Sequence, residues 1–115
     1  MNRNIIGRSG ENQIIRYLID QGWTILEKNF RYQRKEVDII AQKNDLIIFV
    51  EVKTRQSRKF GRGMEAIDQL KRNNIIFVAR YYIEKNHMHN CDFRFDVASV
   101  DYDSFTYIEN AFQIE

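Results

Sequence analysis

Residues 36–53 read EVDIIAQKNDLIIFVEVK, and this stretch decides the fold. Two apolar runs flank the pair Asn44-Asp45, a combination typical of a two-residue β-hairpin turn. We therefore predict an antiparallel hairpin formed by residues 36–42 and 46–53.

The two-residue turn also predicts which side chains share a face of the hairpin. One face is continuously apolar, and we expect it to lie in the core, with Ala41 opposite Ile48, Ile39 opposite Val50, and Val37 opposite Val52. The other face places Asp38 opposite Glu51, and Glu36 opposite Lys53. A shift of one residue would mix charged and apolar side chains on both faces, so the pattern favours this register.

Two carboxylates placed directly across a sheet repel each other and destabilise it, so we expect a positive group between Asp38 and Glu51. Lys53 follows Glu51 on the same face and supplies part of that charge. A divalent cation neutralises two acids better, and oxygen ligands favour Mg²⁺ or Mn²⁺. Glu11, one turn before the apolar pair Ile14-Ile15 of a predicted helix, is a candidate third ligand.

Three acids and a lysine around such an ion are suited to cleaving a phosphodiester bond. The ion polarises the phosphoryl oxygen and lowers the pKa of a bound water. Lys53 orients that water and stabilises the charge that develops on the phosphate. We therefore predict a catalytic site made of Glu11, Asp38, Glu51 and Lys53, in which the three acids are the metal ligands.

Other periodic segments complete an α/β pattern. Ser9 is a candidate N-cap for a helix over residues 9–21, and a long second helix is expected over residues 64–86 with Ile67, Leu70, Phe77, Val78, Tyr81 and Tyr82 on one face. Strands are expected at residues 23–30 and 93–98, with an optional last strand at 105–108. The order αβββαβ predicts a mixed central sheet flanked by helices, in a single domain spanning residues 1–115.

Composition bounds the class of protein. The chain has 115 residues, one cysteine and a net charge of +2, which excludes a disulfide scaffold and fits a reducing compartment. No apolar run approaches the roughly 20 residues of a membrane span, and the N-terminus lacks a signal-peptide pattern. From these features we expect a soluble cytoplasmic protein without a membrane partner.

Positive charge is concentrated in the first part of the chain. Residues 1–71 hold 14 Lys/Arg against 9 Asp/Glu, whereas residues 72–115 hold 4 against 7. The loop that follows Lys53 contains four more basic residues, and the second helix carries a further candidate, which gives a predicted nucleic-acid-binding set of Arg55, Arg58, Lys59, Arg62 and Lys71. Such a cluster suits a phosphate backbone, although a solvated charged surface is the alternative.

The pieces Asp38 and Glu51-Val52-Lys53 resemble the motif of the PD-(D/E)XK nuclease superfamily. A wider set of segments is similar to the small YraN-like bacterial proteins, a branch of that superfamily: Gly7-Arg8-Ser9-Gly10-Glu11, Glu36-Val37-Asp38-Ile39-Ile40, Phe49 to Arg55, Arg94-Phe95-Asp96-Val97 and Asn110-Ala111-Phe112. The resemblance implies a restriction-endonuclease-like core and active-site positions at Glu11, Asp38, Glu51 and Lys53. It also implies, by fold-level analogy, action on branched DNA.

Three functions remain open at this point. The first is a metal-dependent nuclease acting on DNA, in which the basic residues hold phosphates without reading sequence. The second is a nucleic-acid-binding module with an inactive nuclease site. The third is a protein-interaction subunit whose basic surface contacts an acidic partner. A homodimer fits the first function, because a small chain offers little surface for gripping a duplex.

Overall fold

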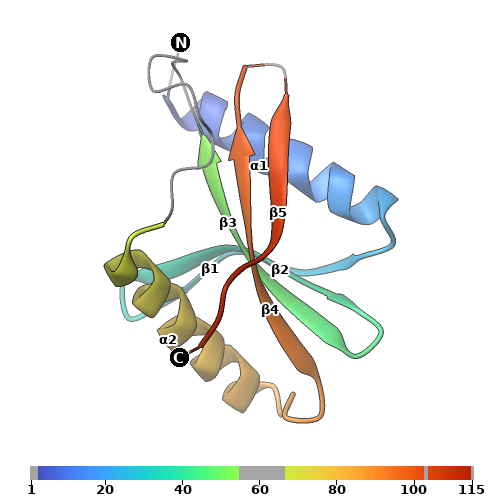
Figure 1. Ribbon diagram of the computed structural model, residues 1–115, viewed down its shortest axis with the longest axis vertical. Coiled ribbons are helices and arrows are strands. Elements are labelled where there is room, and N and C mark those ends of the chain that lie inside the picture. The colour runs from blue at the N-terminus through green and yellow to red at the C-terminus, as the bar shows by residue number, and fades with distance from the viewer. Residues whose placement is uncertain (1–2, 55–66, 103, 115) are drawn as a thin grey trace.

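The computed structural model describes residues 3–54, 67–102 and 104–114. Along the chain the elements are α1 (Arg3–Asp20), β1 (Thr24–Tyr32), β2 (Lys35–Lys43), β3 (Leu46–Thr54), α2 (Gln69–Lys85), β4 (Asp92–Val100) and β5 (Phe105–Phe112) (Figure 1). The predicted αβββαβ order is confirmed, and the optional last strand is present and longer than expected.

The strands form one mixed sheet in the order β1-β2-β3-β4-β5. Only β3 and β4 are parallel, and α2 lies in the connection between them. The other neighbours are antiparallel. The predicted two-residue turn is correct: Lys43 pairs with Leu46, and the ladder continues to the pair Ile39 and Val50.

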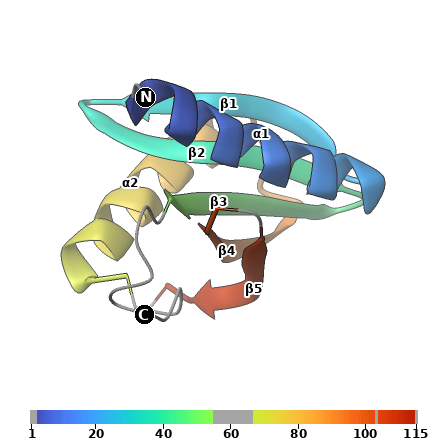
Figure 2. The same cartoon turned by 90° about the horizontal axis from the view of Figure 1, so that it is seen from above.

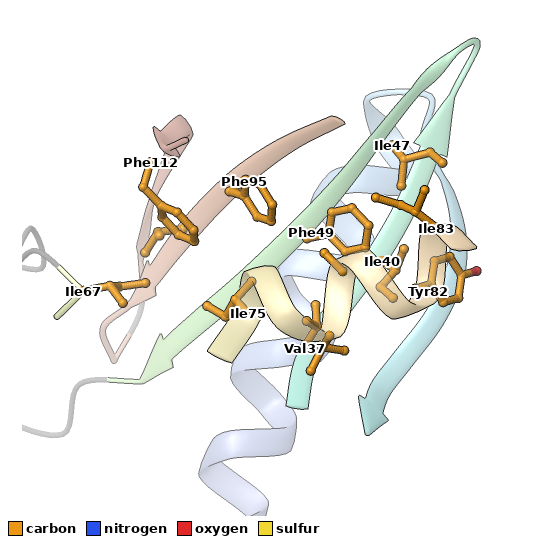
Figure 3. Packing of buried hydrophobic residues seen from close by; sticks show 13 residues of the cluster. Val37, Ile40, Ile47, Phe49, Ile67, Ile75, Tyr82, Ile83, Phe95 and Phe112 are labelled. Carbon is orange, nitrogen blue, oxygen red and sulfur yellow. The ribbon is translucent and has the colours of Figure 1, made fainter. Parts of the chain in front are cut away.

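The two helices cover opposite faces of the sheet (Figure 2). Under α1, Ile14 and Leu18 pack on the apolar face predicted from the hairpin, including Ile39, Ala41, Ile48 and Val50. The opposite face is apolar over most of its area too, because α2 packs on Ile40, Ile47 and Phe49 (Figure 3). Both faces of β2 and β3 are therefore buried, as expected when a crossover helix covers a parallel strand pair.

The first helix begins six residues before the predicted N-cap Ser9, so that prediction was wrong. Gly7 and Gly10 disfavour a helix locally, but Gly10 is needed where α1 crosses the sheet. A Cβ atom at Gly10 would lie 3.1 Å from Oγ1 of Thr54 and 3.6 Å from Cβ of Val100. The glycine thus allows close packing of helix on strand.

The second helix is shorter than predicted. It begins at Gln69 after the N-cap Asp68, whose side chain accepts a hydrogen bond from the backbone N–H of Lys71 at 2.8 Å. Residues 64–66 of the predicted helix lie outside the described part of the chain. Leu70, assigned from sequence to the apolar face, is 71% exposed, because the buried face is formed by Ile75, Val78, Ala79, Tyr82 and Ile83.

Candidate active site

The candidate site lies where β2 and β3 separate. The ladder between these strands ends at Ile39 and Val50, so the predicted continuation that pairs Asp38 with Glu51 and Glu36 with Lys53 does not form. Instead, Oδ2 of Asp38 accepts a hydrogen bond from the backbone N–H of Val52 at 2.8 Å. The carboxylate thereby replaces a backbone acceptor at the point where the strands diverge.

The side-chain alternation of β2 is also broken at this point. Strict alternation puts Val37 on the same face as Ile39, under α1. The structure packs Val37 in the opposite cluster, with Ile40 under α2, which corrects the predicted pairing with Val52. Asp38 lies between these differently directed residues, and its carboxylate reaches across to β3 rather than lying in either apolar cluster.

Glu51 is a buried acid with one partnered oxygen and one unpartnered oxygen. Its side chain is 11% exposed, and Oε2 forms an ion pair with Nζ of Lys71 at 3.3 Å. Oε1 is buried and has no hydrogen-bond donor among the described residues. No N–H, hydroxyl or cationic group of the described residues serves this oxygen, so its charge has to be balanced by the proton of the neighbouring Asp38 carboxyl or by a cation.

Burial and mutual repulsion shift both acids in the same direction. Burial, followed by the negative charge of Glu51, raises the pKa of Asp38 to about 8. Burial also raises the pKa of Glu51, and the ammonium group of Lys71 opposes that shift. Both shifts favour a proton held between the two carboxyl groups, as their hydrogen bond requires.

These features fit a divalent cation. Two buried carboxyl groups that share one proton provide hard oxygen ligands, and they carry excess negative charge once the proton leaves. Within the described ranges, however, no three His, Cys, Asp or Glu residues are grouped closely enough to hold an ion together. Asp38 and Glu51 would supply two of the ligands, and the metal site stays a prediction.

Glu11 approaches this pair from α1. It lies in the third turn of the helix, so the charge of the helix N-terminus, which would explain an acid in the first turn, does not account for its position. Burial and the negative charge of Asp38 raise the pKa of Glu11, whereas a hydrogen bond with the side chain of Asn29 lowers it. The charge of Asp38 therefore affects the pKa of Glu11, and the role of Glu11 as a third ligand stays a prediction.

Lys53 is half-buried on β3, two residues after Glu51. Its predicted partner Glu36 pairs instead with Arg31, at 3.3 Å. No ion pair or hydrogen bond of the Lys53 side chain is seen with the described residues, so the ammonium group that neutralises Glu51 comes from Lys71.

The predicted nucleic-acid contacts divide into two groups. Arg55, Arg58, Lys59 and Arg62 lie outside the residues that the structure describes. Lys71 lies at the site itself, paired with an acid rather than free on the surface. Sequence reasoning assigned Lys71 only to phosphate binding, because nothing local to α2 shows that its first turn lies against the end of β3.

The fold and the site together define a class: an α/β protein with an αβββαβ core and two acids and a lysine on adjacent strands, consistent with the PD-(D/E)XK superfamily. The chain belongs to the UPF0102 family, because the family model described as "Uncharacterised protein family UPF0102" matches residues 10–100. The resemblance to YraN-like proteins is thereby confirmed.

Several relatives match along most of their length. A UPF0102 protein of Clostridioides difficile is 49% identical over 100 residues, which cover 87% of this chain and 88% of the relative. One from Caldicellulosiruptor saccharolyticus is 45% identical over 87% of this chain and 85% of its own. A third, from Sulfurihydrogenibium, is 39% identical over the whole of both chains.

Neither helix of the described structure is long and apolar enough to cross a membrane.

Proposed function

We propose that this protein is a metal-dependent nuclease that hydrolyses phosphodiester bonds in DNA, with branched or otherwise structured DNA as its substrate. The observation that carries the proposal is the buried pair of Asp38 and Glu51, in which Oε1 of Glu51 has no N–H, hydroxyl or cationic donor among the described residues and the pKa of Asp38 is raised to about 8. Buried acids with strongly raised pKa values beside a lysine are a recurrent feature of catalytic sites.

The roles of the residues follow from their positions. Asp38 and Glu51 hold Mg²⁺ or Mn²⁺, with Glu11 as an accessory ligand. The bound ion supplies Lewis-acid activation of the phosphate and of a water molecule. Lys53, whose ammonium group has no ion-pair partner among the described residues, is available to orient the attacking water and to stabilise negative charge on the phosphate.

Binding of the substrate is assigned to basic side chains close to the site in sequence. Arg55, Arg58, Lys59 and Arg62 follow Lys53 directly and would contact phosphates, which gives affinity without sequence specificity. Because a structured substrate presents several strands, a homodimer with two sites is the assembly that we expect for paired cuts.

Cleavage assays with matched variants test this function. Purified protein is incubated with supercoiled plasmid, linear duplex and a four-way junction, with Mg²⁺, Mn²⁺ or EDTA. We expect metal-dependent products from the wild type and a loss of at least about 100-fold in rate for Asp38→Asn and for Lys53→Met. Arg80→Met removes one exposed charge from α2 and should retain the activity.

The same assay separates the alternatives. DNA binding without metal-dependent products from any of the three substrates would contradict nuclease activity on them and favour a binding module. Absence of DNA binding even at low salt would contradict both readings and favour a protein-interaction role, because phosphate contacts are strongest at low ionic strength.

A further inference from the structure

Lys71 occupies a position that the proposed catalytic scheme leaves unexplained. It is the third residue of α2, and its backbone N–H is fixed by the N-cap Asp68 at 2.8 Å. Its side chain extends to Oε2 of Glu51 at 3.3 Å, yet it is 42% exposed. The ammonium group therefore lies on a flexible stem that is anchored at one end and open to solvent at the other.

Lys71 and a divalent cation would compete for the carboxylate of Glu51. Oε2 of Glu51 already has a cationic partner, and a dication held by the same carboxylate would repel an ammonium group a few ångströms away. Lysine suits such an exchange because it is a point charge with free rotation, whereas the planar guanidinium of arginine favours a fixed pairing.

We propose that Lys71 is a displaceable counterion: it neutralises Glu51 in the metal-free protein, and it moves from Glu51 to a phosphate of the nucleic acid when a divalent cation binds. This inference rests on the proposed nuclease site. It couples the two ligands, because each favours the state in which Lys71 has left Glu51, so each should tighten the binding of the other.

The change in Mg²⁺ affinity on removal of Lys71 tests the proposal, because a competing counterion and a lysine that only positions Glu51 predict changes of opposite sign. We expect Lys71→Met to bind Mg²⁺ about three- to tenfold more tightly than the wild type, because a competing cation is removed. Lys71→Arg keeps the charge and should bind Mg²⁺ no more tightly than the wild type. Arg80→Met loses one charge from the same helix about 13 Å away and should change the affinity little. Calorimetric titration at pH 8.5 measures all four proteins.

DNA affinity provides the second measurement. Fluorescence anisotropy with a labelled four-way junction, with and without Ca²⁺ as a substitute ion that limits cleavage, should show tighter binding by the wild type when the ion is present. That gain should be clearly smaller for Lys71→Met and retained by Arg80→Met. A thermal melt of each variant confirms that it is folded.

The outcomes separate this inference from the nuclease function. Weaker or unchanged Mg²⁺ binding by folded Lys71→Met would overturn it, because a lysine that only positions Glu51 lowers the affinity when removed. An undiminished Ca²⁺-dependent gain in DNA affinity for that variant would also overturn it. If Lys71→Met binds Mg²⁺ more tightly than the wild type, and the wild type cleaves none of the DNA substrates, the counterion role is supported and the nuclease function is rejected. Absence of Mg²⁺ binding by both proteins would reject both proposals.

Discussion

Two aspartates of the same sheet show how differently a buried acid can be held. Asp96 on β4 is fully buried and accepts four hydrogen bonds, from Nε and Nη2 of Arg94 at 2.9 Å, from the hydroxyl of Tyr107 at 2.6 Å and from the backbone N–H of Asn110 at 2.9 Å. Asp38 on β2 accepts one from the described backbone, that of Val52, and lies against the carboxyl group of Glu51.

The difference separates a structural acid from the acid of the proposed site. Around Asp96 the chain supplies every donor that a carboxylate needs, and the guanidinium of Arg94 balances its charge. Around Asp38 and Glu51 the described residues supply Val52 and Lys71 and leave Oε1 of Glu51 without an N–H, hydroxyl or cationic donor. An unsatisfied buried polar group lowers stability, so its presence beside a lysine is what we expect if the proposed cation completes the site.

Removing the charge of Asp96 from its hydrogen-bond network should have the largest effect on stability. Asp96→Asn removes the negative charge that faces Arg94, and we expect it to lower the free energy of unfolding by about 3 kcal/mol, because it leaves a largely buried guanidinium without its main counterion. Of the described acids, Glu109 remains beside Arg94 at 3.4 Å, and its side chain is 68% exposed. Urea denaturation monitored by circular dichroism measures the loss.

The matched control is the same change at the other aspartate. If Asp96→Asn and Asp38→Asn lowered the free energy of unfolding equally, the distinction between a structural and a functional acid would fail. A loss of DNA cleavage by Asp96→Asn with unchanged stability would contradict it as well.

A middle-sized effect is expected from the pH dependence of the metal-free protein. The pKa of Asp38 is raised from 3.8 to about 8 on folding, so the native state holds a proton that the unfolded chain releases. The resulting stabilisation is complete below about pH 4 and is lost as the pH rises through about 8. Asp38→Asn removes this dependence, and we expect it to be more stable than the wild type at pH 9 by about 1 to 2 kcal/mol.

Thermal melts of both proteins between pH 5 and pH 9, in EDTA, test the sign. The advantage of Asp38→Asn should grow with pH, and Mg²⁺ at pH 8.5 should raise the melting temperature of the wild type but not of the variant. A wild type whose stability relative to the variant increased with pH would show that Asp38 is charged and satisfied in the metal-free protein.

The parts of this comparison that the sequence predicted are the local ones. The register of the hairpin followed from the Asn44-Asp45 turn and the alternation beside it, because a two-residue loop leaves few ways to pair the strands. The contact of Arg94 with Asp96 is local in the same way, because residues two apart on one strand share a face of the sheet.

The features that the sequence did not predict depend on contacts between distant segments. In the sequence Gly10 disfavours a helix, and the reason for a glycine there is its close packing against Thr54 and Val100, which the sequence does not show. Lys71 is 20 positions from Glu51, and their ion pair depends on how α2 packs against the sheet. The break in alternation at Asp38 arises where β2 and β3 separate, and the local hydrophobic pattern continues unchanged through that point.

The smallest effect is expected at the second orphaned group of the described structure. Ser99 is 1% exposed on β4, its hydroxyl oxygen has no partner among the described residues, and it lies beside Lys53 in the parallel ladder. If it is only an unpaired hydroxyl, Ser99→Ala should raise the free energy of unfolding by up to about 1 kcal/mol and leave Mg²⁺ affinity unchanged. Urea denaturation and calorimetry with the same protein sample measure both.

A destabilised variant would show that the hydroxyl of Ser99 has a partner in solution. A variant with weaker Mg²⁺ binding would extend the site to β4, so that both orphaned groups would belong to one functional centre beside Lys53.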